Sequence, residues 1–199
     1  MTKLTPEDIA SLDDGQWLTD NVIRKYSEIA ISGLPEEKKR VVYVAEPTFF
    51  SVISAMRTEN RLNIAANWLE DEKVLERERI IIPVHDTRRN HWALVIVFVQ
   101  DRQIVAYDSV ASIATADLYT TTVGDWLRYV EKRATGQCGE WNLAVGHVGQ
   151  QRNPFDCGAY LLAFAAQVLV HGNVVQKDVD CSQVRRIVKK ALLTTEKTK

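Results

Sequence analysis

Residues 92–107 read WALVIVFVQDRQIVAY and predict the hairpin at the centre of the fold. Two runs of β-branched and aromatic residues, 92–99 and 104–107, flank the short polar connection 100–103. Such runs form strands, and a connection of this length joins them as an antiparallel pair. A further apolar run, 80–84, precedes them and suits a third strand. We therefore expect a small sheet with this hairpin at its centre.

Helices are expected around that sheet because apolar residues recur at helical spacing before and after it. The pair Thr5-Pro6 suits the N-cap and first position of a short helix. The other segments with helical spacing are 20–33, 47–56, 62–75, 118–130, 159–170 and 184–193, and two shorter runs, 41–44 and 141–148, suit strands. The predicted class is α+β, with a small central, mostly antiparallel sheet flanked by helices.

The composition is that of one globular domain. The chain has 199 residues, of which 46% are hydrophobic and 26% charged, and its 25 basic and 26 acidic side chains leave a net charge of −1. This balance excludes a disordered or fibrous chain and gives no overall attraction to nucleic acid. No internal repeat or linker divides the sequence, so residues 1–199 are expected to form a single domain.

The beginning of the chain and its cysteines indicate an intracellular protein. Residues 1–8 contain a proline and two acidic residues where a secretory signal needs an apolar run. Cys138, Cys157 and Cys181 are odd in number and form no CxxC pair, so we expect free thiols. A membrane span needs about 20 consecutive apolar residues, and no run in the sequence reaches that length. We therefore expect no membrane partner.

His91 and Asp108 are predicted to lie at the same end of the central hairpin. His91 directly precedes one strand and Asp108 ends the next, so antiparallel pairing brings the two together. A histidine beside a carboxylate is the base and the orienting acid of a nucleophilic triad. Without a nucleophile, however, a surface histidine near a strand-end acid is the better interpretation. The catalytic hypothesis therefore depends on a third residue.

Cys157 is the candidate nucleophile. It stands in the tripeptide DCG where a strongly apolar helix begins, and the helix dipole there favours the thiolate. Gln151, in the polar loop before it, is a candidate hydrogen-bond donor to an oxyanion, together with the backbone N–H of Cys157. The alternatives are a buried structural cysteine and a solvated glutamine. Cys138 and Cys181 lack this setting and are expected to be spectators.

Other motifs for catalysis or cofactor binding are missing from the sequence. It contains no GxxxxGK[ST] or GxGxxG loop, no HExxH helix and no GxSxG elbow. His85 and His91 flank two arginines, without the clustered thiolates or carboxylates of a metal site. We therefore expect no metal and no cofactor. His85, His147 and His171 are interpreted as structural or surface residues.

A series of motifs, in order along the chain, resembles the Ulp/SENP cysteine proteases that process SUMO and related ubiquitin-like modifiers. The resemblance covers nearly the whole chain and implies the papain-like fold of that family. Thr19 and Gly149 depart from the pattern, because the family usually has Asn and Pro at these positions, and Pro154 just before the candidate nucleophile is a further departure. The motifs are WLTD at 17–20, TFF at 48–50, IPVH at 82–85, HW at 91–92, YDS at 107–109 and QQRNPFDCG at 150–158.

The resemblance implies a role for each matching residue in the chemistry. Cys157 would be the nucleophile, and His91 would be the general base and acid. Asp108 would orient His91, and Gln151 would donate to the oxyanion. These are the four chemical roles of a cysteine peptidase.

It also implies how the substrate is held. Trp17 and Trp92 would form the walls of a tunnel that admits the Gly-Gly tail of a modifier, and Asp20 would contact the modifier itself. Two indoles can enclose a backbone that carries no side chains, whereas bulkier residues clash.

The expected activity is that of a monomeric isopeptidase and endopeptidase acting on a ubiquitin-like modifier and its conjugates, in the cytoplasm or the nucleus. SUMO is the favoured modifier, and a NEDD-type modifier or ubiquitin is the alternative. Acetyltransferases of the same clan use the same triad, so an acetyltransferase is a second hypothesis, against which Trp17 and Trp92 argue. A catalytically idle modifier-binding module is the third, against which the four filled roles argue.

Overall fold

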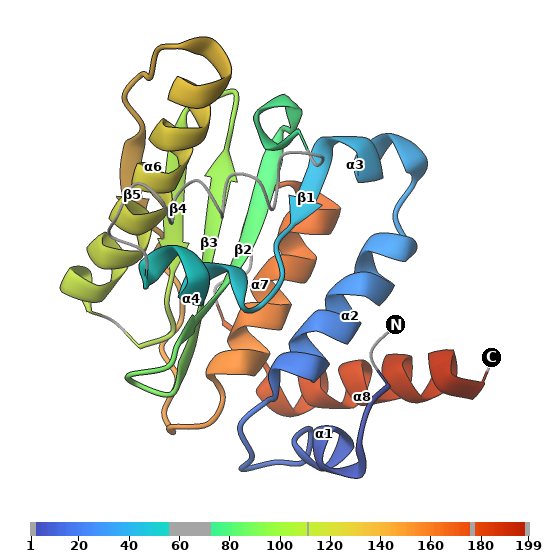
Figure 1. Cartoon of the computed structure of the whole chain (residues 1–199). Coiled ribbons are helices and arrows are strands. Elements are labelled where there is room, and N and C mark those ends of the chain that lie inside the picture. Colours follow the sequence, from blue (N-terminus) through green and yellow to red (C-terminus); the bar gives the residue numbers. More distant parts are fainter. Residues whose placement is uncertain (1–2, 56–72, 111, 176–177, 198–199) are drawn as a thin grey trace.

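A five-stranded sheet, in the order β1-β2-β3-β4-β5, runs through the middle of the computed structural model (Figure 1). The structure describes residues 3–55, 73–110, 112–175 and 178–197. The strands are β1 (Val42–Val44), β2 (Arg79–Asp86), β3 (His91–Phe98), β4 (Gln103–Tyr107) and β5 (Asn142–Val145). The three central strands are antiparallel, and each edge strand runs parallel to its neighbour.

The predicted central hairpin is confirmed. β3 and β4 pair antiparallel, with Leu94 opposite Tyr107 and Phe98 opposite Gln103. Seven of the eight residues of β3 are buried, because helices cover both faces of the sheet. This explains why the strand reads as one continuous apolar run instead of an alternating one.

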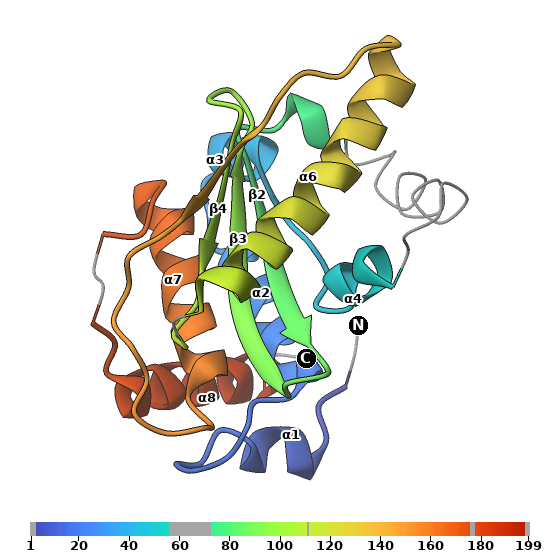
Figure 2. The same cartoon turned by 90° about the vertical axis from the view of Figure 1, so that its left-hand side faces the viewer.

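Alternate residues of the central strands build two separate cores. Leu94 and Ile96 face one core, together with side chains from the helices α2 (Asp20–Ser32), α7 (Cys157–His171) and α8 (Cys181–Lys197). The intervening residues face the other core, together with α4 (Phe49–Ser54) and α6 (Ile113–Thr135). In Figure 2 the sheet is seen nearly edge-on, with α6 and α4 on one side and α7 and α8 on the other.

The remaining helices complete the two layers and their rim. They are α1 (Pro6–Ala10), α3 (Glu36–Val41), α4 (Phe49–Ser54), the short 3₁₀ turn η1 (Val74–Glu76) and α6 (Ile113–Thr135). Thr5 caps α1 through a capping box, as the sequence predicts. The predicted helix 62–75 lies outside the described residues except at its end, which is a 3₁₀ turn.

α7 is the helix that carries the candidate nucleophile, and it is buried as expected. Its 15 residues pack between the sheet and the helices α2 and α8. This explains why it is apolar nearly all round. Among the helices that the structure describes, none is long and apolar enough to cross a membrane.

Strand β5 is shorter than the run 141–148 predicts. It ends at Val145, because Gly146 passes directly over the ring of Tyr107. A Cβ atom at Gly146 would lie 2.2 Å from Cε1 of Tyr107, so a larger residue cannot continue the strand along this path. The chain then runs as a loop to the start of α7.

Candidate active site

The structure brings His91 and Asp108 together at one end of the central hairpin. Nε2 of His91 lies 2.6 Å from Oδ1 of Asp108, and both residues are buried. The same oxygen accepts a hydrogen bond from the backbone N–H of Val110 at 2.8 Å. The carboxylate is therefore held by its own turn while it orients the imidazole.

Cys157 meets the other side of the imidazole. It is the first residue of α7, and 1% of its surface is exposed. Burial lowers the pKa of His91, but hydrogen bonds to Asp108 and Cys157, together with their negative charges, outweigh burial and raise that pKa to about 9. Because Nε2 faces Asp108, Nδ1 is the ring nitrogen left for the sulfur. The arrangement suits a thiolate–imidazolium pair.

Arg89 brings a positive charge next to Asp108, and the sequence analysis did not single out this residue. Oδ2 of Asp108 is buried and has no hydrogen bond to any residue that the structure describes, and Nη2 of Arg89 lies 3.6 Å from it. Arg89 is itself held by Asp86, at 3.1 Å, and by the hydroxyl of Tyr119, at 2.9 Å. The signal in the sequence was the basic pair Arg88-Arg89 between His85 and His91.

Gln151 lies beside the end of the hairpin that carries Asp108. Its backbone N–H donates to the carbonyl of Ser109 at 2.9 Å, and its side-chain oxygen accepts from the hydroxyl of Ser109 at 2.7 Å. The amide nitrogen donates within its own loop, to the carbonyl of Asn153. The loop that precedes Cys157 is thereby attached to the turn that follows Asp108.

The two tryptophans differ in exposure and in partners. Trp17 is 46% exposed, and its indole N–H donates to the carbonyl of Pro154 at 2.9 Å. Trp92 is 3% exposed, and its indole N–H donates to the carbonyl of Leu18 at 3.1 Å. Both indoles therefore bind backbone next to the candidate site, one in the loop before Cys157 and one in the segment before α2.

The glycine after the nucleophile is required by packing. A Cβ atom at Gly158 would lie 2.9 Å from Cβ of Leu18, closer than real side chains approach. The DCG tripeptide thus lets the start of α7 lie directly against the segment that leads into α2. Trp92 holds the carbonyl of this same Leu18.

His85 lies between Asp20 and Trp92. Oδ1 of Asp20, the first residue of α2, is 3.9 Å from Nδ1 of His85, and the Asp20 side chain is 46% exposed. The ring of His85 stacks on that of Trp92, with 4.2 Å between centroids. His85, interpreted from sequence as structural or surface, is therefore part of the support of Trp92.

Thr19, one of the residues that depart from the family pattern, makes its hydrogen bonds inside the protein. Its hydroxyl donates to Oδ1 of Asp8 at 2.6 Å and accepts from the backbone N–H of Val22, which caps α2. Asp8 is buried and belongs to α1. Thr19 therefore fastens α1 to α2, whereas Asp20 beside it stays accessible.

The other two cysteines lie away from the His91 imidazole. Cys138 is exposed in the loop between α6 and β5. Cys181 begins α8, and burial, together with the negative charge of Asp156, raises the pKa of its thiol to about 12. A thiol with such a pKa stays protonated at neutral pH.

Several named proteases resemble this chain over most of its length. Human sentrin-specific protease 5 is 25% identical to this chain over 195 residues, and mouse sentrin-specific protease 3 is 24% identical over 198 residues. Each alignment covers 95% of this chain. NEDD8-specific protease 1 of Schizosaccharomyces pombe is 24% identical over 176 residues, covering 82% of this chain and 39% of its own. The chain spans 24% of the length of sentrin-specific protease 5 and 32% of sentrin-specific protease 3.

Solved structures share the fold. The SUMO protease Ulp1 with its catalytic cysteine oxidised to a sulfinic acid superimposes with a TM-score of 0.80 at 20% identity, over 97% of this chain and 84% of that one. The Ulp1 protease domain in complex with SMT3, the yeast orthologue of SUMO, gives 0.77 at 20% identity, over 97% and 84% of the two chains. The model of the Ulp1 protease family, C-terminal catalytic domain, matches residues 16–196. The chain therefore belongs to the Ulp1 protease family.

Proposed function

We propose that this protein is a cysteine peptidase that cleaves after the C-terminal Gly-Gly of a ubiquitin-like modifier, with SUMO as the favoured modifier. The observation that carries the proposal is the buried imidazole of His91 between the carboxylate of Asp108 and the thiol of Cys157 at the start of a helix. The family and the names of the relatives support the same activity.

The reaction uses each of these groups in turn. The thiolate of Cys157 attacks the carbonyl of the terminal glycine, and the oxyanion accepts hydrogen bonds from Gln151 and from the backbone N–H of Cys157. His91 gives its proton to the departing amine, which leaves a thioester on Cys157. His91 then takes a proton from water, which attacks the thioester; the C–S bond breaks, the modifier leaves with a terminal carboxyl group, and the thiolate–imidazolium pair is restored. Asp108 holds the imidazole and stabilises its charged form throughout.

The Gly-Gly tail is placed between Trp17 and Trp92 on its way to Cys157. Two features support this placement: the first indole is bound to the loop before Cys157, and the second borders His91 in the sequence. Asp20 is the proposed contact with the globular part of the modifier, and its exposure supports that role. A NEDD-type modifier is the second candidate, since a NEDD8-specific protease is among the relatives.

We further propose that residues 1–199 act as one catalytic domain inside the cell, in the cytoplasm or the nucleus. The family match over 16–196 and the attachment of α1 to α2 through Asp8 support a single unit. The three cysteines are unpaired, which is consistent with a reducing compartment.

The proposal is tested with SUMO, a NEDD-type modifier and ubiquitin, each bearing a thiol-reactive group in place of its terminal carboxylate. We expect SUMO to form a covalent adduct fastest, at Cys157, and Cys157→Ala to form none. Trp92→Ala should slow the reaction with the preferred modifier, because the tail is held less firmly against the sulfur.

Three outcomes would contradict this expectation in different ways. A fastest adduct with the NEDD-type modifier or ubiquitin would change the substrate and keep the activity. Binding without an adduct would favour the idle module. If no modifier reacts or binds while Cys157 is readily alkylated by iodoacetamide, the peptidase proposal is wrong, and acetyl-CoA-dependent labelling becomes the next measurement.

A further inference from the structure

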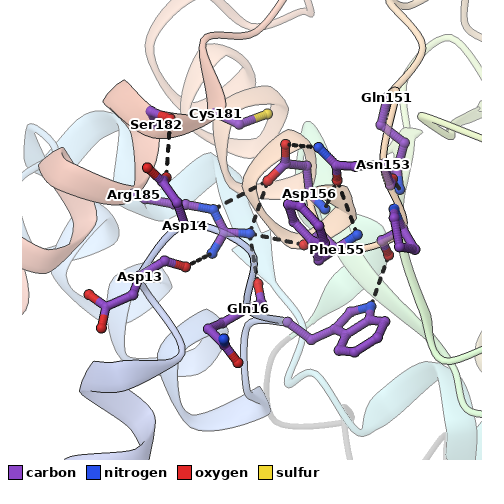
Figure 3. A network of polar contacts seen from close by, with 12 residues as sticks. Asp13, Asp14, Gln16, Gln151, Asn153, Phe155, Asp156, Cys181, Ser182 and Arg185 are labelled. Atoms are coloured by element: carbon purple, nitrogen blue, oxygen red, sulfur yellow. Dashed lines mark hydrogen bonds and ion pairs between the residues drawn. The ribbon is translucent and has the colours of Figure 1, made fainter.

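Arg185, in the second turn of α8, makes a set of hydrogen bonds that the proposed function does not use. Its side chain is 2% exposed, so the guanidinium is buried. Figure 3 shows this group enclosed by chain segments that are far apart in the sequence. The acceptors are the carbonyls of Ser11 (3.1 Å) and Asp13 (3.2 Å) for Nη1, those of Gln16 (2.8 Å) and Phe155 (2.9 Å) for Nη2, and Oδ1 of Asp156 for Nη2 (3.0 Å) and Nε (3.3 Å).

These acceptors belong to two loops. The first, residues 11–17, is here called the Trp17 loop, because it ends in the proposed wall of the Gly-Gly passage. The second, residues 153–156, is called the nucleophile loop, because it ends directly before Cys157. Arg185 binds backbone carbonyls in both, so its rigid fork sets how far apart they lie.

A second contact joins the same two loops nearer to the site. The indole of Trp17 donates to the carbonyl of Pro154 at 2.9 Å. Gln16, whose carbonyl Arg185 holds, is the residue before Trp17. The indole is therefore placed by two groups: the nucleophile loop binds its ring, and Arg185 fixes the backbone that carries it.

The network continues from Arg185 to the proposed oxyanion donor. Asp156 gives Oδ1 to Arg185 and accepts at Oδ2 a hydrogen bond of 2.7 Å from the side chain of Asn153. The backbone carbonyl of Asn153 in turn accepts from the amide of Gln151 (Figure 3). The Arg185–Asp156 ion pair thus connects α8 to the nucleophile loop and, through Asn153, to Gln151.

A buried guanidinium is costly unless its donors are satisfied, and here carbonyls and a carboxylate satisfy them. Lysine would carry the same charge, but its three donors radiate from one nitrogen and do not match a planar fork. The arrangement therefore depends on the geometry of arginine as well as on its charge.

We propose that Arg185 is a positioning residue for substrate binding, which holds the Trp17 loop against the nucleophile loop and so sets the passage for the Gly-Gly tail. This inference rests on the proposed function. Arg185 acts on substrate binding through Trp17, and we expect the reactivity of the Cys157–His91 pair not to depend on it.

The test compares Arg185→Lys and Arg185→Met with the wild type in two reactions. The first is hydrolysis of the preferred modifier carrying a C-terminal fluorophore, which requires the passage. The second is alkylation of Cys157 by iodoacetamide, which does not. Misplacing a substrate by about 1 Å costs on the order of a hundredfold in rate, so we expect KM to rise and kcat/KM to fall about tenfold to a hundredfold, with alkylation unchanged.

Lys189→Met is the matched control. Lys189 lies one helical turn further along α8, and its ammonium pairs with Oδ1 of Asp13 in the same Trp17 loop at 2.7 Å. The pair is solvent-exposed, and within the described residues Lys189 makes no hydrogen bond to the nucleophile loop. We expect this variant to keep the wild-type KM.

A double-mutant cycle with Trp17→Ala separates positioning from general destabilisation. If Arg185 acts through Trp17, adding Arg185→Lys to Trp17→Ala changes KM little, although each change alone raises it. Urea unfolding and circular dichroism verify that each variant is folded. Arg185→Lys keeps the buried charge, so it serves if Arg185→Met does not fold.

Several results would overturn the inference. Additive effects on KM in the cycle would show that Arg185 does not act through Trp17. An equal loss of iodoacetamide reactivity would assign Arg185 to the nucleophile instead. Arg185→Lys with the KM of Lys189→Met would remove the role altogether. The wild type is the reference for each result, so its failure to cleave any modifier would reject the proposed function rather than this inference.

Discussion

His91 is the residue whose ionisation should control activity. Burial lowers its pKa, but Asp108 and Cys157 outweigh burial and raise it to about 9. A histidine whose pKa is higher in the folded than in the unfolded protein stabilises the folded state. This stabilisation is fully present at a pH below the unfolded-state pKa of about 6.5, and it is lost as the pH rises through the folded-state pKa of about 9. The protonated form is also the acid that the leaving amine needs.

We therefore expect kcat/KM for a modifier–fluorophore substrate to fall as the pH rises above about 9. Asp108→Asn should move this decline to lower pH, because the neutral amide no longer stabilises the imidazolium. It should also reduce turnover, by up to about 10⁴-fold by analogy with serine protease triads. Rate profiles from pH 6 to 10, with circular dichroism as a folding control, make the measurement. An unchanged alkaline limb in Asp108→Asn would show that this acid does not set the ionisation of His91.

Gln151 is the residue whose two possible roles can be separated. Its side-chain oxygen binds Ser109, whereas its amide nitrogen is the proposed oxyanion donor. Gln151→Ala should lower kcat on the order of a hundredfold, since one oxyanion donor is lost. Ser109→Ala removes this side-chain hydrogen bond but keeps the Gln151 amide and the backbone hydrogen bond between the two residues, so its loss should be much smaller. Equal losses in the two variants would indicate that Gln151 acts by holding its loop in place.

At the scale of elements, the decisive contact is between the start of α7 and the segment that leads into α2. Gly158 lies against Leu18, and Trp92 of β3 binds the carbonyl of that same leucine. Three elements distant in sequence thereby enclose the nucleophile. A side chain at Gly158 has to push them apart.

Gly158→Ala is expected to destabilise the protein and to slow cleavage, because its Cβ would lie 2.9 Å from Cβ of Leu18. Overpacking of this kind costs about 1–3 kcal/mol. Gly33→Ala is the control, since its Cβ would meet its nearest neighbours at an ordinary 3.7 Å and the backbone φ is −80°. Urea unfolding and kcat/KM are measured for both. A stable, fully active Gly158→Ala would mean that α7 and α2 separate easily.

At the scale of the whole molecule, Asp8 joins the N-terminal helix to the rest. It is buried and accepts hydrogen bonds from Thr19 at 2.6 Å, from Asn21 at 3.3 Å and from the backbone of Thr5 at 2.9 Å. Burial raises the pKa of Asp8, but these hydrogen bonds outweigh burial and lower it below its usual range. The charged carboxylate is therefore the form that the folded state prefers.

A lowered pKa contributes stability above the unfolded value near 3.8, and this stability is lost as the pH falls below it. Asp8→Asn should reduce the free energy of unfolding at pH 7 and flatten its decline on acidification. Urea unfolding of both proteins between pH 7 and 3 measures this. Parallel curves for the two would show that Asp8 does not couple the fold to pH.

Most of the predicted helix 62–75 lies outside the residues that the structure describes. Elsewhere the positions of most elements follow from short-range patterns, although the helix α3 (Glu36–Val41) was not expected from the sequence. The run 92–107 is apolar in β3 and β4 and polar between them, and such a run has few ways to fold. The meeting of His91 and Asp108 follows too, because an antiparallel hairpin has one register here.

By itself, therefore, the sequence determined the elements, the hairpin and the candidate reacting groups, the last with the help of the family resemblance. The tertiary structure decided the contacts between elements that are distant along the chain. These contacts include the two loops around Arg185, Arg89 beside Asp108, Thr19 turned toward Asp8, and Gly158 packed against Leu18. The physical reason is that hydrophobic periodicity specifies which face of a helix is buried, whereas the partners of a polar side chain depend on how the helices are packed against one another.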